Sequence, residues 1–240
     1  MSCLERDGVR IHYEIAGTGP ALLLTHGFTG SSVDFAKNVA ALARKHTVIS
    51  WDLRGHGKSD CPVDPSAYSV PLSMGDMGAL LDRAGAERAF LAGHSLGGFL
   101  SLEFHLSQRE RVAGLILIDT GPGYRSETPR AGWNARAERI AQNFEAKGGD
   151  RALGLARAAR GMLAQHDGRV LQSLPGIAVP TLIVVGENDA AFLGGSRYMA
   201  DKIPRAKLEL IANAGHSPQI DEPGAFDRAV SQFLAARDSS

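Results

Sequence analysis

A serine flanked by glycines is the part of this sequence best suited to chemistry. Residues 93–97 read Gly-His-Ser-Leu-Gly and follow the apolar run Phe90 to Ala92. This pattern predicts a strand, a sharp turn carrying Ser95, and then a helix. Glycines at such a turn let neighbouring backbone approach closely, and the N-terminus of the helix favours developing negative charge. We therefore predict that Ser95 is the nucleophile of an acyl-transfer reaction.

A serine nucleophile needs a base to take its proton, and the base needs an acid to orient it. Of the eight histidines, His216 is the one that follows Ser95 in a loop at the carboxyl end of an expected strand. Asp189 follows the expected strand 181–185, so the chain order is serine, acid, histidine. Asp119 also ends a strand on the same edge and is the alternative acid. We favour Asp189 and interpret Asp119 as a carboxylate that caps the segment after it.

The oxyanion that forms during acyl transfer needs N–H donors already in place. The N–H of Leu96, directly after the nucleophile, is one candidate. Phe28 is the second, because His-Gly-Phe at 26–28 directly follows the apolar run 21–25. The alternative interpretation of residues 26–28 is an ordinary glycine turn at the end of a strand.

Short apolar runs alternate with segments of helical period, which predicts an α/β fold with a mainly parallel sheet. Helices are expected around residues 35–42, 77–84 and 226–233, with Asp221 as the N-cap of the last. The expected strands are 9–15, 21–25, 47–51, 89–92, 115–118, 181–185 and 207–211.

The regular alternation stops after Asp119. Roughly sixty residues separate the strand ending at Ile118 from the strand starting at Thr181, which is too long for a structureless loop. We expect two helices, separated by Gly148 and Gly149, that form a lid over the carboxyl edge of the sheet, where α/β enzymes bind ligands. The expected division is a core domain of residues 1–120 and 180–240 and a helical lid of residues 121–179.

The lid aromatics are candidates for the substrate pocket. Trp133, Phe144 and Met162 of the lid, together with Phe28 and Phe192, could line an apolar site. The alternative is that the lid side chains only hold its helices onto the sheet. The lid also has nine basic against five acidic residues. This surplus either attracts anionic substrates or forms a solvated outer face, and we favour the solvated face.

Composition limits the class of protein. The 240 residues are 44% apolar and 22% charged, as expected for one large globular domain. Basic and acidic residues balance at 26 each, which counts against nucleic-acid binding. No run is long and apolar enough for a signal peptide or a membrane span, and no cluster has the spacing of a metal site. We expect a cytoplasmic enzyme that acts on a small molecule, without membrane association, metal or cofactor.

Together these residues resemble the α/β-hydrolase superfamily over nearly the whole chain, in the capped branch with a serine nucleophile that includes esterases and enol-lactonases. The resemblance implies an eight-stranded sheet with a helical cap after the sixth strand. It also implies that Ser95 is the nucleophile, Asp189 the acid and His216 the base, with Phe28 and Leu96 as the oxyanion hole. The matching segments are 26–28, 52–59, 93–98, 186–189 and 215–216.

Departures from the family pattern separate its branches. Haloalkane dehalogenases and epoxide hydrolases use Asp at the position of Ser95, so the resemblance disfavours both. The lyase branch usually carries Arg shortly after this serine, where this chain has Phe99. The segment after Asp189 reads Ala-Ala-Phe-Leu, whereas the family often has a proline there.

Three functions remain after this reasoning. The favoured one is hydrolysis of a carboxylic ester, or of a small acyl compound such as a lactone, through an acyl-enzyme. The second is a carbon–carbon bond hydrolase or lyase that uses the same three residues. The third is a ligand-binding protein with negligible turnover, which the presence of all three residues disfavours.

Overall fold

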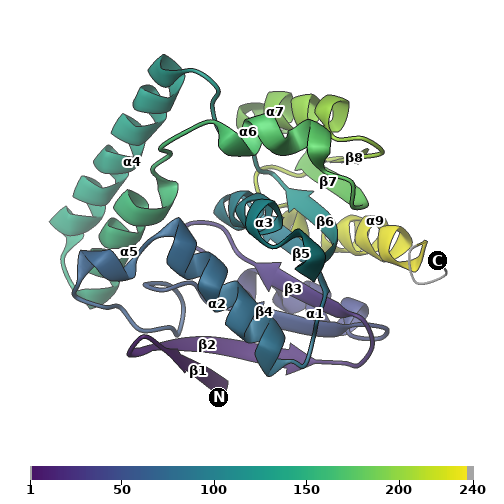
Figure 1. Ribbon diagram of the computed structural model, residues 1–240, viewed down its shortest axis with the longest axis horizontal. Helices are drawn as coiled ribbons and strands as arrows, with labels where there is room; N and C mark the ends of the chain where they lie inside the picture. The colour runs from purple at the N-terminus through teal and green to yellow at the C-terminus, as the bar shows by residue number, and fades with distance from the viewer. Residues whose placement is uncertain (1, 237–240) are drawn as a thin grey trace.

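The structure is a computed structural model that describes residues 2–236. Its strands form one sheet in the order β1-β2-β4-β3-β5-β6-β7-β8, drawn as the central arrows of Figure 1. The strand bounds are β1 Ser2–Arg6, β2 Val9–Ala16, β3 Ala21–Thr25, β4 Thr47–Trp51, β5 Ala89–His94, β6 Val112–Ile118, β7 Thr181–Gly186 and β8 Lys207–Ile211.

The sheet is mainly parallel. β3 to β8 pair in parallel, and only β2 runs antiparallel to its neighbours β1 and β4. Every residue of β3, β5 and β7 is buried, as expected where helices cover both faces of a parallel sheet. The eight strands and flanking helices confirm the predicted α/β-hydrolase fold class.

The helices cover both faces of the sheet. Successive side chains of β3 point to opposite faces: Leu23 packs in the same apolar cluster as α2, α3 and α7, whereas Leu22 and Leu24 pack with α1 and α9. The helix bounds are α1 Ala36–Leu42, α2 Val70–Arg83, α3 Leu96–Ser107, α4 Glu127–Lys147, α5 Asp150–Ala158, α6 Arg169–Ser173, α7 Ala190–Lys202, α8 Pro218–Asp221 and α9 Pro223–Ala235.

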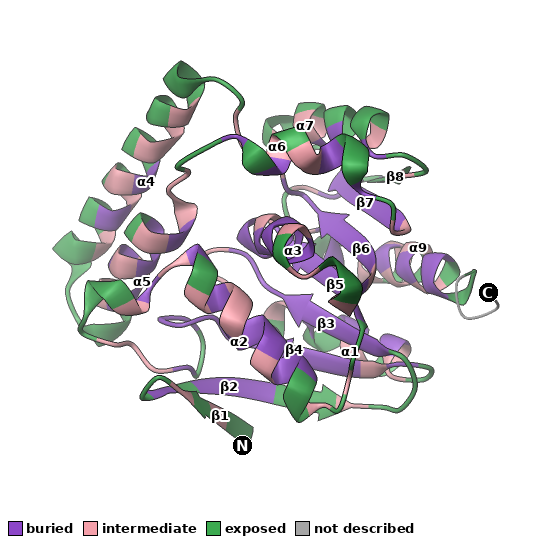
Figure 2. Cartoon of the chain, in the orientation of Figure 1, coloured by how far each residue is buried: buried purple, intermediate pink, exposed green. Residues whose placement is uncertain are grey.

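Residues 121–179, named here the helical insertion, contain α4, α5 and α6. α4 and α5 lie side by side at one side of the sheet (Figure 1), and Gly148 and Gly149 separate them with φ of +68° and +82°. Figure 2 shows α4 largely exposed or half-buried, in contrast to the buried strands. The Trp133 Nε1–H donates to the Leu163 carbonyl oxygen at 2.7 Å and so joins α4 to the segment that follows α5. That the insertion acts as a lid stays a prediction.

Two local features differ from expectation. β1 was not predicted from its residues, because it is an edge strand whose side chains are mostly exposed and show no apolar alternation. The N-cap of α9 is Glu222, so the prediction of Asp221 was wrong. Asp221 ends α8, and its Oδ2 accepts the Gly215 N–H at 2.9 Å, beside the loop residue His216.

No helix within residues 2–236 is both long and apolar enough to span a membrane.

Candidate active site

Ser95 lies on a strained turn between β5 and α3. Its φ and ψ are +51° and −113°, and α3 begins at the next residue. A non-glycine residue in this left-handed region costs about 1–3 kcal/mol, so the surrounding structure must hold it there. The packing is tight: a Cβ on Gly93 would lie 2.2 Å from the Gly97 oxygen, and one on Gly97 would lie 2.2 Å from the Thr25 oxygen. Only glycine fits at both positions.

This packing makes a direct prediction for Gly97→Ala. The added methyl group must displace the backbone of β3, and we expect the free energy of unfolding to fall by about 1–3 kcal/mol. Activity should fall as well, because the shift moves Ser95. Gly132→Ala on α4 is the matched control, since a Cβ there meets nothing within 4 Å, and it should stabilise the protein by up to about 1 kcal/mol. Urea unfolding checks both variants, and equal stabilities would contradict the packing argument.

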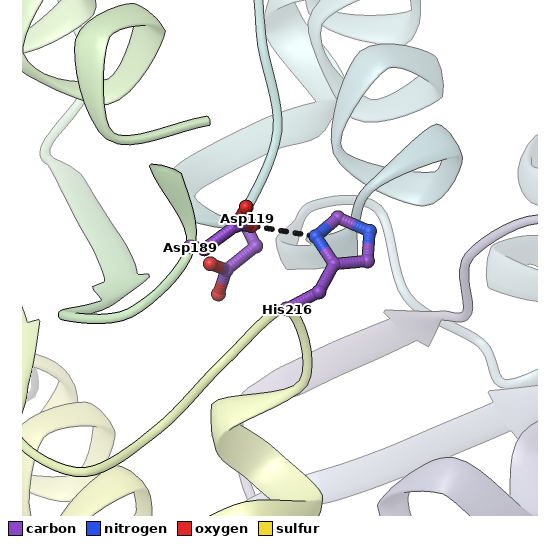
Figure 3. Close-up of side chains that lie close together, drawn as sticks. All are labelled: Asp119, Asp189 and His216. Carbon is purple, nitrogen blue, oxygen red and sulfur yellow. Dashed lines mark hydrogen bonds and ion pairs between the residues drawn. The ribbon is translucent and has the colours of Figure 1, made fainter. Parts of the chain in front are cut away.

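Asp189 and His216 form a hydrogen-bonded pair. Asp189 Oδ2 lies 2.6 Å from His216 Nδ1, as the dashed line in Figure 3 shows. The carboxylate only accepts hydrogen bonds, so Nδ1 carries the proton and Nε2 is left as the acceptor. Asp189 is buried at the start of α7, where its Oδ1 accepts the Ala191 N–H at 3.2 Å. His216 follows β8, and its side chain is 43% exposed.

The loop that carries His216 is held against the turn that carries Ser95. His94 precedes Ser95, and its Nε2–H donates to the His216 carbonyl oxygen at 2.6 Å. Burial lowers the pKa of His94 to about 4, so this side chain is neutral at pH 7. On the other side, the Phe192 ring stacks on His216 with 4.9 Å between centroids. No hydrogen bond joins Ser95 Oγ to His216 within residues 2–236. Such bonds are often long without substrate.

Asp119 lies beside this pair and does not bind the histidine. It follows β6 with φ of +40°, is fully buried, and its Oδ1 accepts the Gly186 N–H at 3.0 Å. One ligand atom each of Asp119, Asp189 and His216 lies within 4.8 Å of the others (Figure 3). Burial, with the charge of Asp189 adding to it, raises the pKa of Asp119 to about 8. At neutral pH Asp119 therefore keeps its proton.

These three residue types also bind metals, but the contact distance favours a proton. Two ligands on one tetrahedral zinc, each about 2.0–2.2 Å from the ion, lie about 3.4 Å apart. The separation of 2.6 Å between Asp189 Oδ2 and His216 Nδ1 is that of a short hydrogen bond.

The raised pKa of Asp119 predicts how stability depends on pH. Between its ordinary pKa of 3.8 and about 8, Asp119 holds its proton only in the folded chain. The folded state then binds more protons than the unfolded state, so this residue makes the free energy of unfolding fall as pH rises through that range. Asp119→Asn resembles the protonated acid and should be more stable than wild type at pH 8, with the difference shrinking towards pH 4. Urea unfolding across this range checks the prediction, and parallel pH profiles would contradict it.

The proposed oxyanion donors are the N–H groups of Leu96, the first residue of α3, and of Phe28 in the turn after β3. Neither N–H donates a hydrogen bond within the described part of the chain. A Cβ on Gly27 would lie 3.1 Å from Ser95 Cβ, so the turn after β3 packs directly against the nucleophile. His26 fixes this turn, because its Nε2 accepts the Leu53 N–H at 3.0 Å and its Nδ1–H donates to the Gly27 oxygen at 2.7 Å.

Asp52, in the segment 52–59 that matches the family, holds two backbone segments together. Its Oδ1 accepts the Ser32 N–H at 2.6 Å, and its Oδ2 accepts the Lys58 N–H at 2.7 Å. These bonds join the loop after β4 to the segment before α1, away from the acid–histidine pair.

A cavity of about 230 Å³ opens at Ser95, and we name it the catalytic cavity. Three of the predicted pocket residues, Trp133, Met162 and Phe192, line it. The other two candidates, Phe28 and Phe144, do not; their rings pack against each other, with 6.0 Å between centroids. Phe144 lies on the same stripe of α4 as Trp133, but eleven residues later, about 16 Å along the helix axis. The substrate-pocket predictions for the Phe28 and Phe144 side chains are therefore corrected.

Sequence reasoning also missed several lining residues. Phe99 could have been found, because it lies one helical turn after Ser95 and so on the same face of α3. No sequence pattern indicated Gln165, because it lies after the end of the second insertion helix and so outside any helical period. The other residues that line the catalytic cavity are Leu96, Thr120, Gly121, Pro122, Gly123, Tyr124, Leu163, Ala191 and Gly195.

Comparison with known proteins assigns the family. The model of the alpha/beta hydrolase family matches residues 22–229, and the chain belongs to this family of enzymes. It is 31% identical to "Putative carbamate hydrolase RutD" of Pseudomonas savastanoi pv. phaseolicola, over 91% of this chain and 95% of that protein. It is 28% identical to "Putative 2-succinyl-6-hydroxy-2,4-cyclohexadiene-1-carboxylate synthase" of Bacillus subtilis, over 96% of each. A thermophilic esterase from Thermogutta terrifontis has a similar structure, with a TM-score of 0.83, 27% identity, and coverage of 98% of this chain and 97% of that one.

Proposed function

We propose that this protein is a serine hydrolase that cleaves a small, uncharged carboxylic ester, or a related acyl compound such as a lactone, through an acyl-enzyme on Ser95. One observation carries the proposal. An acid-bound histidine, His216, is held against the strained turn of Ser95, and this serine opens into an apolar cavity. The similarity to a solved esterase at 27% identity supports the same reaction class.

The arrangement suits a two-step mechanism. His216 Nε2 accepts the Ser95 Oγ proton while Oγ forms a bond to the carbonyl carbon, and the carbonyl oxygen becomes an oxyanion facing the Phe28 and Leu96 N–H groups. The bond to the leaving oxygen then breaks, and His216 gives that oxygen its proton, which leaves the acyl group on Ser95. Water repeats the attack with His216 as base, which releases the acid and restores the serine hydroxyl. Asp189 holds the imidazole in the required tautomer throughout.

The lining of the catalytic cavity supports an uncharged substrate. None of its described lining residues is Asp, Glu, Lys or Arg. Two arginines of the helical insertion pair with acids outside this cavity: Arg160 with Glu138 and Glu145, and Arg169 with Glu103 at 2.8 Å. These contacts favour the solvated-face interpretation over the attraction of anionic substrates.

A carbon–carbon bond hydrolase or lyase that uses the same three residues is the second candidate, and the Bacillus subtilis relative, named a synthase, bears on it. The name of that protein includes a carboxylate, and an enzyme for such a compound should offer the anion a positive partner. Phe99 and its neighbours in the catalytic cavity offer no such charge. Ester hydrolysis therefore fits this chain better.

A substrate panel tests the proposal. We expect measurable kcat/KM on p-nitrophenyl acetate and butyrate, and at least about tenfold lower kcat/KM on the anionic hemisuccinate, because no cation in the cavity compensates its charge. Cleavage of a vinylogous 1,5-diketone without cleavage of any ester would overturn the proposal in favour of the second candidate. Equal kcat/KM on butyrate and hemisuccinate would contradict only the proposal that the substrate is uncharged, and would leave ester hydrolysis standing.

A further inference from the structure

A second cavity lies directly behind the catalytic cavity. It also measures about 230 Å³ and is formed by α2, α3 and the segment 161–170 of the helical insertion. Its lining differs in character, because it contains Glu103, His166, Asp167 and Arg169. The two cavities share two lining residues, Phe99 and Gln165. These two side chains therefore form a partition between an apolar space beside Ser95 and a charged space behind it.

Phe99 is a firmly placed part of this partition. It lies four residues after Ser95 in α3, which puts the two side chains on one helix face. Its N–H donates to the Ser95 carbonyl oxygen at 3.2 Å. The ring packs partly on the apolar core and is half-buried, as expected for a side chain with a cavity on either side.

Gln165 completes the partition from the helical insertion. Its backbone is held twice by Asn134 of α4: the Gln165 N–H donates to Asn134 Oδ1 at 2.8 Å, and Asn134 Nδ2 donates to the Gln165 carbonyl oxygen at 2.8 Å. Its side-chain amide has no hydrogen-bond partner within residues 2–236. The amide packs against Gly123, where a Cβ would lie 2.8 Å from Oε1. It therefore serves here as a steric barrier, fixed by its backbone.

The position of His216 indicates which part of the substrate meets this partition. His216 protonates the leaving group in the proposed reaction, yet it does not line the catalytic cavity and its side chain is 43% exposed. The leaving group therefore lies on the exposed side of Ser95. The acyl group must then turn towards α3 and enter the catalytic cavity.

We propose that Phe99 and Gln165 are the specificity-determining end wall that restricts this enzyme to short acyl groups. The inference rests on the proposed ester hydrolysis. The catalytic cavity, at about 230 Å³, is smaller than the roughly 300–1,000 Å³ of pockets that hold drug-sized ligands. Removal of the Phe99 ring would join it to the second cavity and roughly double the volume available to the acyl chain.

Acyl-length profiles test the end wall. kcat/KM is measured for p-nitrophenyl butyrate and octanoate with wild type, Phe99→Ala, Gln165→Ala and the conservative control Phe99→Leu. We expect wild type to prefer butyrate by at least about tenfold, since an overlong chain must displace packed groups. Phe99→Ala and Gln165→Ala should each raise the octanoate-to-butyrate ratio by about tenfold or more, as four further methylenes find space against the apolar part of the second cavity, Val70, Pro71 and Val170. Phe99→Leu should keep the wild-type ratio.

The outcomes distinguish failure of the end wall from failure of the proposed ester hydrolysis. Wild type that hydrolyses octanoate as well as butyrate, or an unchanged ratio in the folded variants, overturns the end wall and leaves ester hydrolysis standing. Wild type that hydrolyses no ester overturns the proposed function and the end wall with it. Melting temperatures show which variants are folded, and Gln165→Ala opens the partition from the insertion side if Phe99→Ala does not fold.

Discussion

Ser95→Ala is expected to lower kcat on p-nitrophenyl butyrate by at least about 10⁴-fold, as loss of a serine nucleophile does in triad hydrolases. The side-chain oxygen is the atom that forms the acyl bond, and the described lining of the catalytic cavity offers one other aliphatic hydroxyl, Thr120, whose Oγ1 already donates to the Ser95 carbonyl oxygen at 2.6 Å. Release of p-nitrophenolate measures the rate.

Two further variants control for folding. Ser107→Ala makes the same change on an exposed residue at the end of α3 and should keep full activity. Ser95→Gly should be as inactive as Ser95→Ala but more stable by about 1 kcal/mol, because glycine adopts a positive φ without strain. Ser95→Ala activity within about tenfold of wild type would mean that another group is the nucleophile.

Asp189→Asn carries the second largest expected effect, a fall in kcat of about 10³–10⁴-fold with little change in KM. The asparagine amide would donate to His216 Nδ1, which moves the imidazole proton to Nε2 and leaves no acceptor for the Ser95 proton. The variant should still fold, because its Oδ1 keeps the bond to the Ala191 N–H that caps α7.

Asp119→Asn is the matched comparison, since it makes the same change on the neighbouring buried acid. Its Oδ1 keeps the Gly186 N–H bond, and asparagine resembles the protonated form that the raised pKa favours. We expect kcat to change by less than about tenfold, because the hydrogen bond that sets the imidazole tautomer comes from Asp189 and not from Asp119. A large loss in Asp119→Asn together with an active Asp189→Asn would reverse the assignment of the acid.

The site residues that could be predicted are those that must follow strands. Ser95, Asp189 and His216 each come directly after a strand or its short loop, and the carboxyl ends of parallel strands share one edge of the sheet. Their proximity therefore follows from the strand pattern alone. The glycines at 93 and 97 added the second signal, since a tight turn requires residues without side chains.

The remaining features of the site, namely the choice of acid and the residues that line the cavity, depend on packing that no local sequence pattern predicts. Asp119 and Asp189 both follow strands at the same edge of the sheet, and only the packed structure decides which of them binds His216. Trp133 and Phe144 lie on one stripe of α4, yet the packing of α4 against the rest of the protein decides which of them reaches the catalytic cavity. Two hydrogen bonds between the Gln165 backbone and the Asn134 side chain hold Gln165 at the cavity, and sequence spacing does not reveal them.

Mass spectrometry of the enzyme during turnover tests the central claim most directly. The protein is mixed with p-nitrophenyl butyrate, quenched in acid within the first turnovers, and digested. We predict a butyryl adduct on the peptide that contains Ser95, absent from Ser95→Ala and accumulating in wild type wherever hydrolysis of the acyl-enzyme is slower than its formation. Release of p-nitrophenolate in a stoichiometric burst should accompany it. An adduct on any other residue, or turnover by Ser95→Ala at the wild-type rate, would contradict the account.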